Sequence, residues 1–300
     1  MDSEDDCAER RPVRTPGGIL PPMTVPTLRR VTAGRYVQPL REGGSLPAVV
    51  DTDGGLYVVK FRGAGQGPRA LVAELLVGLI AGRLELPVPE LALVEVPPPF
   101  GRSEPDPEIQ DLLRRSHGLN VGLRYLDGAF NFDGSAAADL VTPEFAARLV
   151  WLDALVTNPD RTHRNPNLLI WQRRPWLIDH GAALYIHHDW AGATDERVRG
   201  PFPLIARHVL LARSDGLEAG DEASAGLLDR ETLRAIVETV PDELLAGPEY
   251  AGDLAPAAQR ARYLDYLTAR LRPPRAFVGA AVEERERLHR LRPLPLSARR

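Results

Sequence analysis

The order of local patterns along the chain constrains its fold more than any other feature, because strand-like segments come first and helical ones follow. Three strands are predicted over about residues 35–61, joined by a glycine-rich turn and a tight Asp-Gly-Gly turn. An apolar helix is predicted over residues 69–84, and two further strands over residues 87–96 and 118–128. This β-β-β-α-β-β order predicts a small β-rich lobe that carries one helix.

The rest of the chain is mainly helical in pattern, apart from two short strands. A helix over residues 142–158 begins with a threonine cap and leads into a polar loop. Short strands are predicted over residues 167–171 and 175–181, and the proline-rich connection 97–117 is expected to hold about one helical turn. Further helices are predicted over residues 201–213, 229–240 and 255–271. The chain is therefore predicted to have an α+β fold with two lobes, the second larger and mainly helical.

Composition and charge exclude several classes of protein. The most apolar run, residues 71–82, is interrupted by a glutamate and is too short to span a membrane. The acidic N-terminal sequence lacks the features of a secretory signal, and Cys7 is the only cysteine. We therefore expect a soluble, cytoplasmic protein with no membrane partner. The net charge of -4 predicts no autonomous binding of nucleic acid.

The lysine content singles out one position. Of the 37 Lys and Arg residues only Lys60 is a lysine, at the end of a predicted strand. A chain that otherwise uses arginine is expected to keep a lysine where a compact ammonium group is needed. Glu74 lies fourteen residues later, inside the apolar helix, and is a candidate partner for that ammonium group. The alternatives are a surface lysine and a solvent-facing glutamate.

A polar loop precedes the first of the two short strands. Residues 158–171 read NPDRTHRNPNLLIW, and Asp179 ends the next strand. Phosphoryl transfer needs a carboxylate to accept the proton of the acceptor hydroxyl, together with oxygen ligands for magnesium. Asp160, Asn165 and Asp179 supply such groups at the spacing typical of kinases. The alternative is a structural Asx turn at Asn158.

These motifs together resemble the protein-kinase superfamily. The lysine, the helix glutamate and the three loop residues occur in kinase order, and the stretch DRTHRNPNLLIW followed by IDHGAALYIHHDW resembles a bacterial branch of the HipA-like kinase family. The resemblance covers about residues 28–275. It implies a two-lobed protein-kinase-like fold with a kinase N-lobe (28–122), a hinge (123–130) and a kinase C-lobe (131–275). Composition predicts a disordered N-terminal arm (1–27) and a charged C-terminal tail (276–300).

The resemblance also implies an activity and roles for residues. The expected activity is ATP-dependent, magnesium-assisted transfer of the γ-phosphate to a hydroxyl, in HipA-like kinases a serine of a protein. The implied roles are Asp160 as base, Asn165 and Asp179 as metal ligands, Lys60 with Glu74 as phosphate clamp, Gly43, Gly44 and Ser45 as phosphate lid, and backbone near Leu123 and Tyr125 as the adenine reader. A small-molecule or lipid kinase, a nucleotide-binding pseudokinase scaffold and an AMP-transferring enzyme remain alternatives.

The sequence also departs from familiar kinase motifs. Arg161 follows the aspartate instead of preceding it, and it is expected either to pair with a phosphate or to brace the loop. His163 is expected to bond backbone, with no catalytic role. His180 replaces the phenylalanine of the Asp-Phe-Gly motif, so no phenylalanine-based switch is carried over. His187 and His188 resemble a metal pair without a third ligand, and we expect them in the segment that meets substrate. No toxin role or antitoxin partner is inferred.

Overall fold

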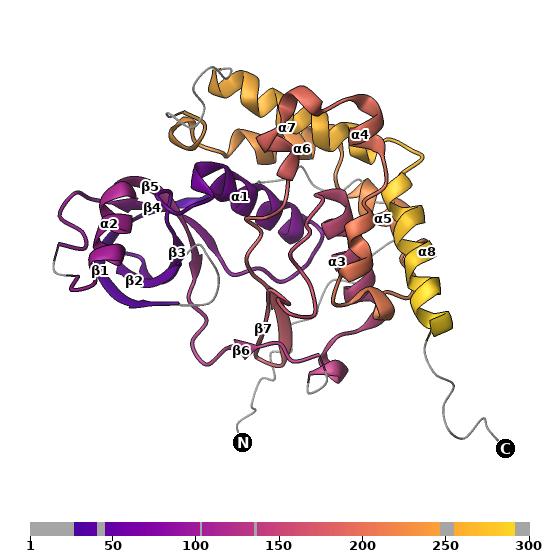
Figure 1. The fold of residues 1–300 in the computed structure, drawn as a ribbon, viewed down its shortest axis with the longest axis horizontal. Coiled ribbons are helices and arrows are strands. Elements are labelled where there is room, and N and C mark those ends of the chain that lie inside the picture. The colour runs from indigo at the N-terminus through magenta and orange to yellow at the C-terminus, as the bar shows by residue number, and fades with distance from the viewer. Residues whose placement is uncertain (1–26, 41–45, 103, 135–136, 247–254, 292–300) are drawn as a thin grey trace, which may run out of the picture.

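The chain has a mixed α+β fold, described by a computed structural model for residues 27–40, 46–102, 104–134, 137–246 and 255–291 (Figure 1). The strands are β1 (Arg29–Pro39), β2 (Ala48–Thr52), β3 (Gly55–Lys60), β4 (Leu91–Val96), β5 (Gly118–Arg124), β6 (Phe130–Asn131), β7 (Leu168–Trp171) and β8 (Arg174–Leu177). The α-helices are α1 (Gly67–Arg83), α2 (Pro107–Arg115), α3 (Pro143–Leu155), α4 (Asp195–Arg199), α5 (Asp221–Gly226), α6 (Arg230–Glu238), α7 (Pro256–Leu271) and α8 (Ala276–Leu291). None of the described helices combines the length and apolar character that a membrane-spanning segment requires.

The first five strands close into a barrel in the order β1-β2-β3-β5-β4. Neighbouring strands are antiparallel, except that β1 closes the barrel by pairing parallel to β4. Side chains alternate between the two faces of a strand. In β3, Tyr57 and Val59 belong to the barrel core, whereas Val58 and Lys60 line a cleft outside it. The strand therefore presents the only lysine of the chain to that cleft.

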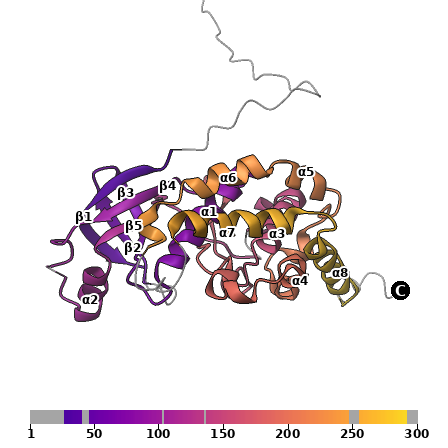
Figure 2. The same cartoon turned by 90° about the horizontal axis from the view of Figure 1, so that it is seen from above.

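Helix α1 connects the barrel to the helical part of the molecule. It packs against β5 on one side and against α6 on another (Figure 2). Every residue from Leu71 to Ala81 is buried, which explains why the helix is apolar on all sides. Glu74 lies within this stretch and is fully buried.

The helical part is organised around α3, which is buried along most of its length. Its end leads into the polar loop that precedes β7. Strands β7 and β8 form a hairpin whose two turn residues, Gln172 and Arg173, both have positive φ angles of 49° and 58°. These angles fit the two-residue turn that matches the twist of paired strands. The hairpin thus holds the loop before β7 beside the loop after β8.

Several elements differ from the sequence prediction. The connection expected to hold one helical turn contains the nine-residue helix α2, capped by Asp106. The predicted helix over residues 201–213 is wrong: this segment forms only the short 3₁₀ helices η4 (Pro203–Arg207) and η5 (Leu211–Arg213). His208 interrupts it by forming a β-bridge with Thr162. Prolines at the start and this bridge account for the missing helix.

The C-terminal residues form a structured helix over part of their length. Helix α8 packs against α3, η4 and η5. Its first turns bury Phe277, Val278 and Ala281, and the rings of Phe277 and Trp151 of α3 pack in a T-shaped arrangement. The charged residues further along this helix are partly or fully exposed.

Candidate active site

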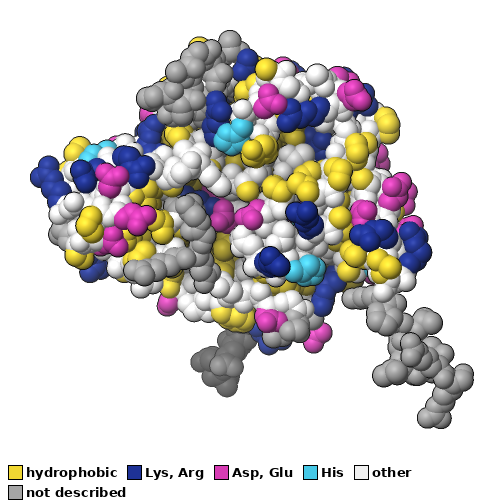
Figure 3. Space-filling model, in the orientation of Figure 1, with side chains coloured by type: hydrophobic (Ala, Val, Ile, Leu, Met, Phe, Trp, Pro, Cys, Tyr) yellow, Lys and Arg dark blue, Asp and Glu magenta, His cyan; other side chains and the backbone are white. Residues whose placement is uncertain are grey.

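A cleft of about 1120 Å³ lies between the barrel and the loops at the ends of α3 and β8. Lys60 and Leu123 line it from the barrel, and Asp160, Asn165 and Asp179 line it from the opposite side. The space-filling view shows the hollow beside the barrel, with acidic side chains in it (Figure 3). The structure therefore brings together five of the residues singled out in the sequence.

The ammonium group of Lys60 lies between two carboxylates. Its Nζ donates to Glu74 Oε2 at 2.7 Å and to Asp179 Oδ1 at 2.5 Å. Burial disfavours the charged amine, but the two carboxylates outweigh burial and raise the pKa of Lys60. For Asp179, burial is likewise outweighed by Lys60, and the pKa of this carboxyl is lowered. Both groups are therefore charged at neutral pH.

Glu74 contacts both the barrel and the loop after β8. Besides Lys60, its Oε2 accepts a hydrogen bond of 2.7 Å from the backbone N–H of His180. Asp179, one residue earlier, has a positive φ of 54°, a conformation that non-glycine residues rarely adopt. The buried glutamate thus helps to hold the backbone that presents Asp179 to the cleft.

Asp160 is held by three asparagines. Its N–H donates to Asn158 Oδ1 at 3.1 Å, so the Asx turn considered from the sequence is present. Its Oδ2 accepts from Asn165 Nδ2 at 2.8 Å and from Asn167 Nδ2 at 3.1 Å. Within the described residues Oδ1 of Asp160 accepts no hydrogen bond. One carboxylate oxygen is therefore fixed and the other is available in the cleft.

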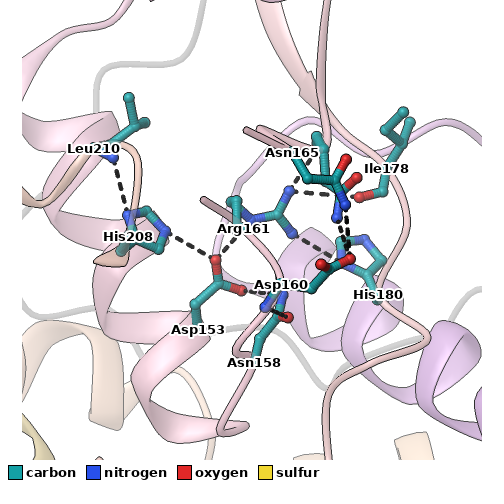
Figure 4. A network of polar contacts seen from close by, with 10 residues as sticks. Asp153, Asn158, Asp160, Arg161, Asn165, Ile178, His180, His208 and Leu210 are labelled. Carbon is teal, nitrogen blue, oxygen red and sulfur yellow. Dashed lines mark hydrogen bonds and ion pairs between the residues drawn. The ribbon is translucent and has the colours of Figure 1, made fainter. Parts of the chain in front are cut away.

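Arg161 braces the loop from inside the molecule (Figure 4). It is 1% exposed, and its Nε donates to Asp153 Oδ2 at 2.6 Å. The same guanidinium donates to the carbonyl oxygens of Asn167 and Ile178 and lies 3.2 Å from His180 Nδ1. These contacts decide between the two expectations for Arg161: it is a brace, buried too deeply to meet a phosphate in the cleft.

Asp153, near the end of α3, is the centre of this buried network. It also accepts from Asn158 Nδ2 at 3.0 Å and lies 2.9 Å from His208 Nε2, while His208 Nδ1 accepts from the N–H of Leu210 (Figure 4). His208 therefore carries its proton on Nε2. Burial alone would raise the pKa of Asp153, but the Arg161 guanidinium outweighs burial, and the pKa lies well below its ordinary value.

His180 is a neutral acceptor in the same network. Burial, and after it the positive charge of Arg161, lowers the pKa of His180 to about 3. Its Nδ1 then accepts from Arg161, which leaves the proton on Nε2. The residue at the phenylalanine position of the familiar motif thus makes a polar contact that phenylalanine cannot make.

The oxygen atoms at the cleft suit a hard cation. The Asp179 carboxylate contacts Lys60 and also accepts a hydrogen bond from the backbone of Gly181. Nδ2 of Asn165 contacts Asp160, and Asn165 Oδ1 accepts no hydrogen bond among the described residues. Carboxylate and amide oxygens are ligands that Mg²⁺ accepts. In the part of the chain that the structure describes, no three His, Cys, Asp or Glu side chains gather as a metal-binding group by themselves. The carboxylate of Asp179 and the amide oxygen of Asn165 therefore fit a magnesium ion that also binds substrate phosphates.

The remaining predicted residues are placed as follows. Leu123 and Tyr125 both line the cleft, but the N–H of Tyr125 donates to the carbonyl of Leu56 at 3.0 Å. The next residue, Leu126, also lines the cleft, and its N–H has no partner in the described chain. The predicted lid residues Gly43, Gly44 and Ser45 lie outside the described residues.

Among the described residues, no third His, Cys, Asp or Glu side chain joins His187 and His188 to form a possible metal-binding group. His187 Nε2 lies 3.2 Å from His188 Nε2, and His187 Nδ1 lies 3.1 Å from the hydroxyl of Tyr263. Burial lowers the pKa values of both histidines. His163 is exposed, and its expected bond to backbone is not found among the described residues.

Sequence reasoning missed Asp153, Asn167 and His208. Asp153 could have been recognised from the sequence, because it is an acid inside an apolar helix, as Glu74 is. A buried acid in such a position needs a partner. Asn167 and His208 carry no such pattern, because their contacts depend on the path of the chain between residues far apart in sequence.

Comparison with known proteins places the chain among the kinases. A family model for HipA-like kinases matches residues 37–243, more than half of the chain and all of the cleft residues described here. The chain belongs to the HipA-like kinase family. Its structure is also similar to the crystal structure of the Helicobacter pylori proinflammatory kinase CtkA, with a TM-score of 0.45 and 12% sequence identity over 81% of this chain and 98% of that chain. No curated protein matches the chain.

Proposed function

We propose that this protein is an ATP-dependent kinase that transfers the γ-phosphate of ATP to a hydroxyl group of a protein, on serine or threonine. The observation that supports this most is the arrangement of Asp160. Two asparagine side chains hold one of its oxygens, and the other is free in the cleft that Lys60 and Asp179 also line. A carboxylate held in this way can accept the proton of a hydroxyl as that hydroxyl attacks a phosphate.

The other side chains of the cleft have complementary roles in this proposal. Lys60, kept charged and positioned by Glu74, binds the phosphates of ATP next to the point of transfer. Asn165 and Asp179 would hold magnesium, which neutralises the charge of the phosphates when it is bound. Glu74 acts through Lys60 and through the backbone of His180, and it is a positioning residue.

The nucleotide is expected to enter between two lobes. In this proposal the barrel with α1 (28–122) is the N-lobe, residues 123–130 are the hinge and residues 131–275 are the C-lobe. Because the N–H of Tyr125 is bonded to Leu56, the adenine donor near Leu123 and Tyr125 would be the amide of Leu126, with the carbonyl of Tyr125 as the acceptor beside it. Gly43, Gly44 and Ser45 stay the expected phosphate lid.

Replacing Asp160 by asparagine tests the proposal. Asp160→Asn removes the base but keeps the shape of the side chain, so transfer from γ-labelled ATP to lysate proteins should fall about 100-fold or more, while binding of a fluorescent ATP analogue persists. Glu218→Gln is the matched control, because Glu218 is exposed and its side chain has no partner in the described chain.

The distribution of label separates the alternatives. Label on proteins, lost in Asp160→Asn and kept in Glu218→Gln, supports the proposed function. Label confined to lipids or small molecules would instead identify the kinase alternatives. Nucleotide binding without any hydrolysis or transfer would identify a pseudokinase scaffold.

A further inference from the structure

The part of the loop that follows Asp160 carries a group of exposed arginine and histidine side chains. His163 and Arg164 are exposed on the loop itself, and Arg164 lines the cleft together with Asp160. The β-bridge between Thr162 and His208 is antiparallel, so residue 207 lies opposite residue 163. Arg207, also exposed, is thereby placed beside the loop.

Within the described residues none of these three side chains has a hydrogen bond or an acidic partner. Most arginines of the described chain do have one, for example Arg197 with Asp189 at 2.5 Å and Arg285 with Asp215 at 3.1 Å. The net charge of the whole chain is -4. The positive charge without an acidic partner at this place is therefore opposite in sign to the net charge. In the space-filling view, Lys or Arg and His side chains lie near the hollow (Figure 3).

An exposed apolar side chain lies next to this group. Leu204 is 42% exposed and precedes Arg207 by three residues in the 3₁₀ helix η4. Side chains three residues apart in a 3₁₀ helix lie on the same face. Leu204 and Arg207 therefore offer an apolar contact and a positive charge side by side, next to the loop that carries Asp160.

We propose that the acceptor is a protein segment with acidic residues next to its hydroxyl and an apolar residue beside them. His163, Arg164 and Arg207 bind the acidic side chains, and Leu204 contacts the apolar one. This inference rests on the proposed function. Without the cationic rim, Asp160 and Asp179 would repel an acidic segment by their own charge. A nucleic acid or an anionic membrane fits less well, because the basic group is small and includes an apolar contact.

The test uses serine peptides that share one leucine and differ only in the residues flanking the serine, which are acidic, neutral or basic. With the full-length protein, magnesium and γ-labelled ATP, the acidic set should be phosphorylated with a kcat/KM about tenfold above that of the neutral set, the scale expected of two partly exposed charge contacts. Arg207→Glu should remove that preference and favour the basic set. Arg234→Glu makes the same charge reversal at an exposed arginine of α6 and should change nothing.

Added salt gives a second measurement, because it screens exposed charges. The preference for the acidic set should shrink as salt rises, while the rate on the neutral set changes little. Equal rates on all three sets, a preference for the basic set, or label found only on added RNA or anionic vesicles would overturn the inference and leave the kinase assignment standing. Absence of any ATP turnover by the wild-type protein would overturn the proposed function itself, and the inference with it.

Discussion

Replacing Asp153 by asparagine tests whether the buried network around it supports the cleft. Asp153→Asn keeps the shape of the side chain and removes its negative charge. The carboxylate is fully buried, and Arg161, its partner at 2.6 Å, is 1% exposed. The substitution therefore leaves a buried guanidinium without a counter-ion.

The expected loss of stability follows from that burial. Breaking a buried ion pair from one side destabilises a protein by about 3–5 kcal/mol. We expect a value of about 3 kcal/mol here, because Arg161 still donates to the carbonyls of Asn167 and Ile178. For a chain of this length that corresponds to a fall in the melting temperature of about 6 °C. The loop that carries Asp160 should also shift, and if Asp160 is the base we propose, a displacement of about 1 Å can lower the rate about 100-fold.

Urea unfolding measures the free energy, and transfer from γ-labelled ATP measures the rate. Asp195→Asn is the matched control, because Asp195 forms an ion pair of 3.2 Å with Arg272 in which both side chains are more than half exposed. Such a pair contributes about 0.5 kcal/mol. If Asp153→Asn lowered stability no more than this control, or left the transfer rate unchanged, the brace would have no role in holding the loop.

Three further predictions concern other groups of the site. An acyl-phosphate analogue of ATP should acylate Lys60 in competition with ATP, and Lys60→Arg should lose most activity while keeping the fold; labelling that ignores ATP would contradict this. Asp179→Asn should abolish the magnesium-dependent part of ATP affinity, as titrations with and without magnesium would show. The pKa of His180 lies near 3 in the folded chain and near 6.5 in an unfolded one, so the unfolded chain takes up this proton first on acidification. The free energy of unfolding should therefore fall by about 1.4 kcal/mol per pH unit below about pH 6.5, and thermal melts between pH 5 and 8 that show no such slope would disprove it.

The sequence predicted those elements whose structure follows from the pattern of their own residues. Strand-like segments separated by turn residues identified all of the strands except β6, and helical spacing identified α1, α3, α6 and α7. The pairing of Lys60 with Glu74 was accessible for a different reason. Each residue is out of place in its own neighbourhood, one as the only lysine and the other as an acid in an apolar helix, and the structure places them 2.7 Å apart.

Features that depend on distant contacts were not accessible from the sequence. The segment 201–213 reads as helical, yet His208 turns toward Asp153 and bridges Thr162, and these contacts outweigh helix propensity. The choice between phosphate contact and brace for Arg161 had no basis in the sequence, because both roles need the same side chain. Only the position of Asp153 under the loop decides it.

Two buried acids, one on each of two apolar helices, bind the residues that position the loops of the cleft. Glu74 in α1 binds Lys60 and the backbone of His180, and Asp153 in α3 binds Arg161 and Asn158. The contact between Arg161 and the ring of His180 joins the two sets, so the loop of Asp160 and the loop of Asp179 are tied to each other behind the cleft. Phenylalanine could not accept that hydrogen bond, and the buried guanidinium would then lack one partner. The histidine after Asp179 is therefore explained by the arginine after Asp160: the two departures from the familiar kinase motifs compensate each other.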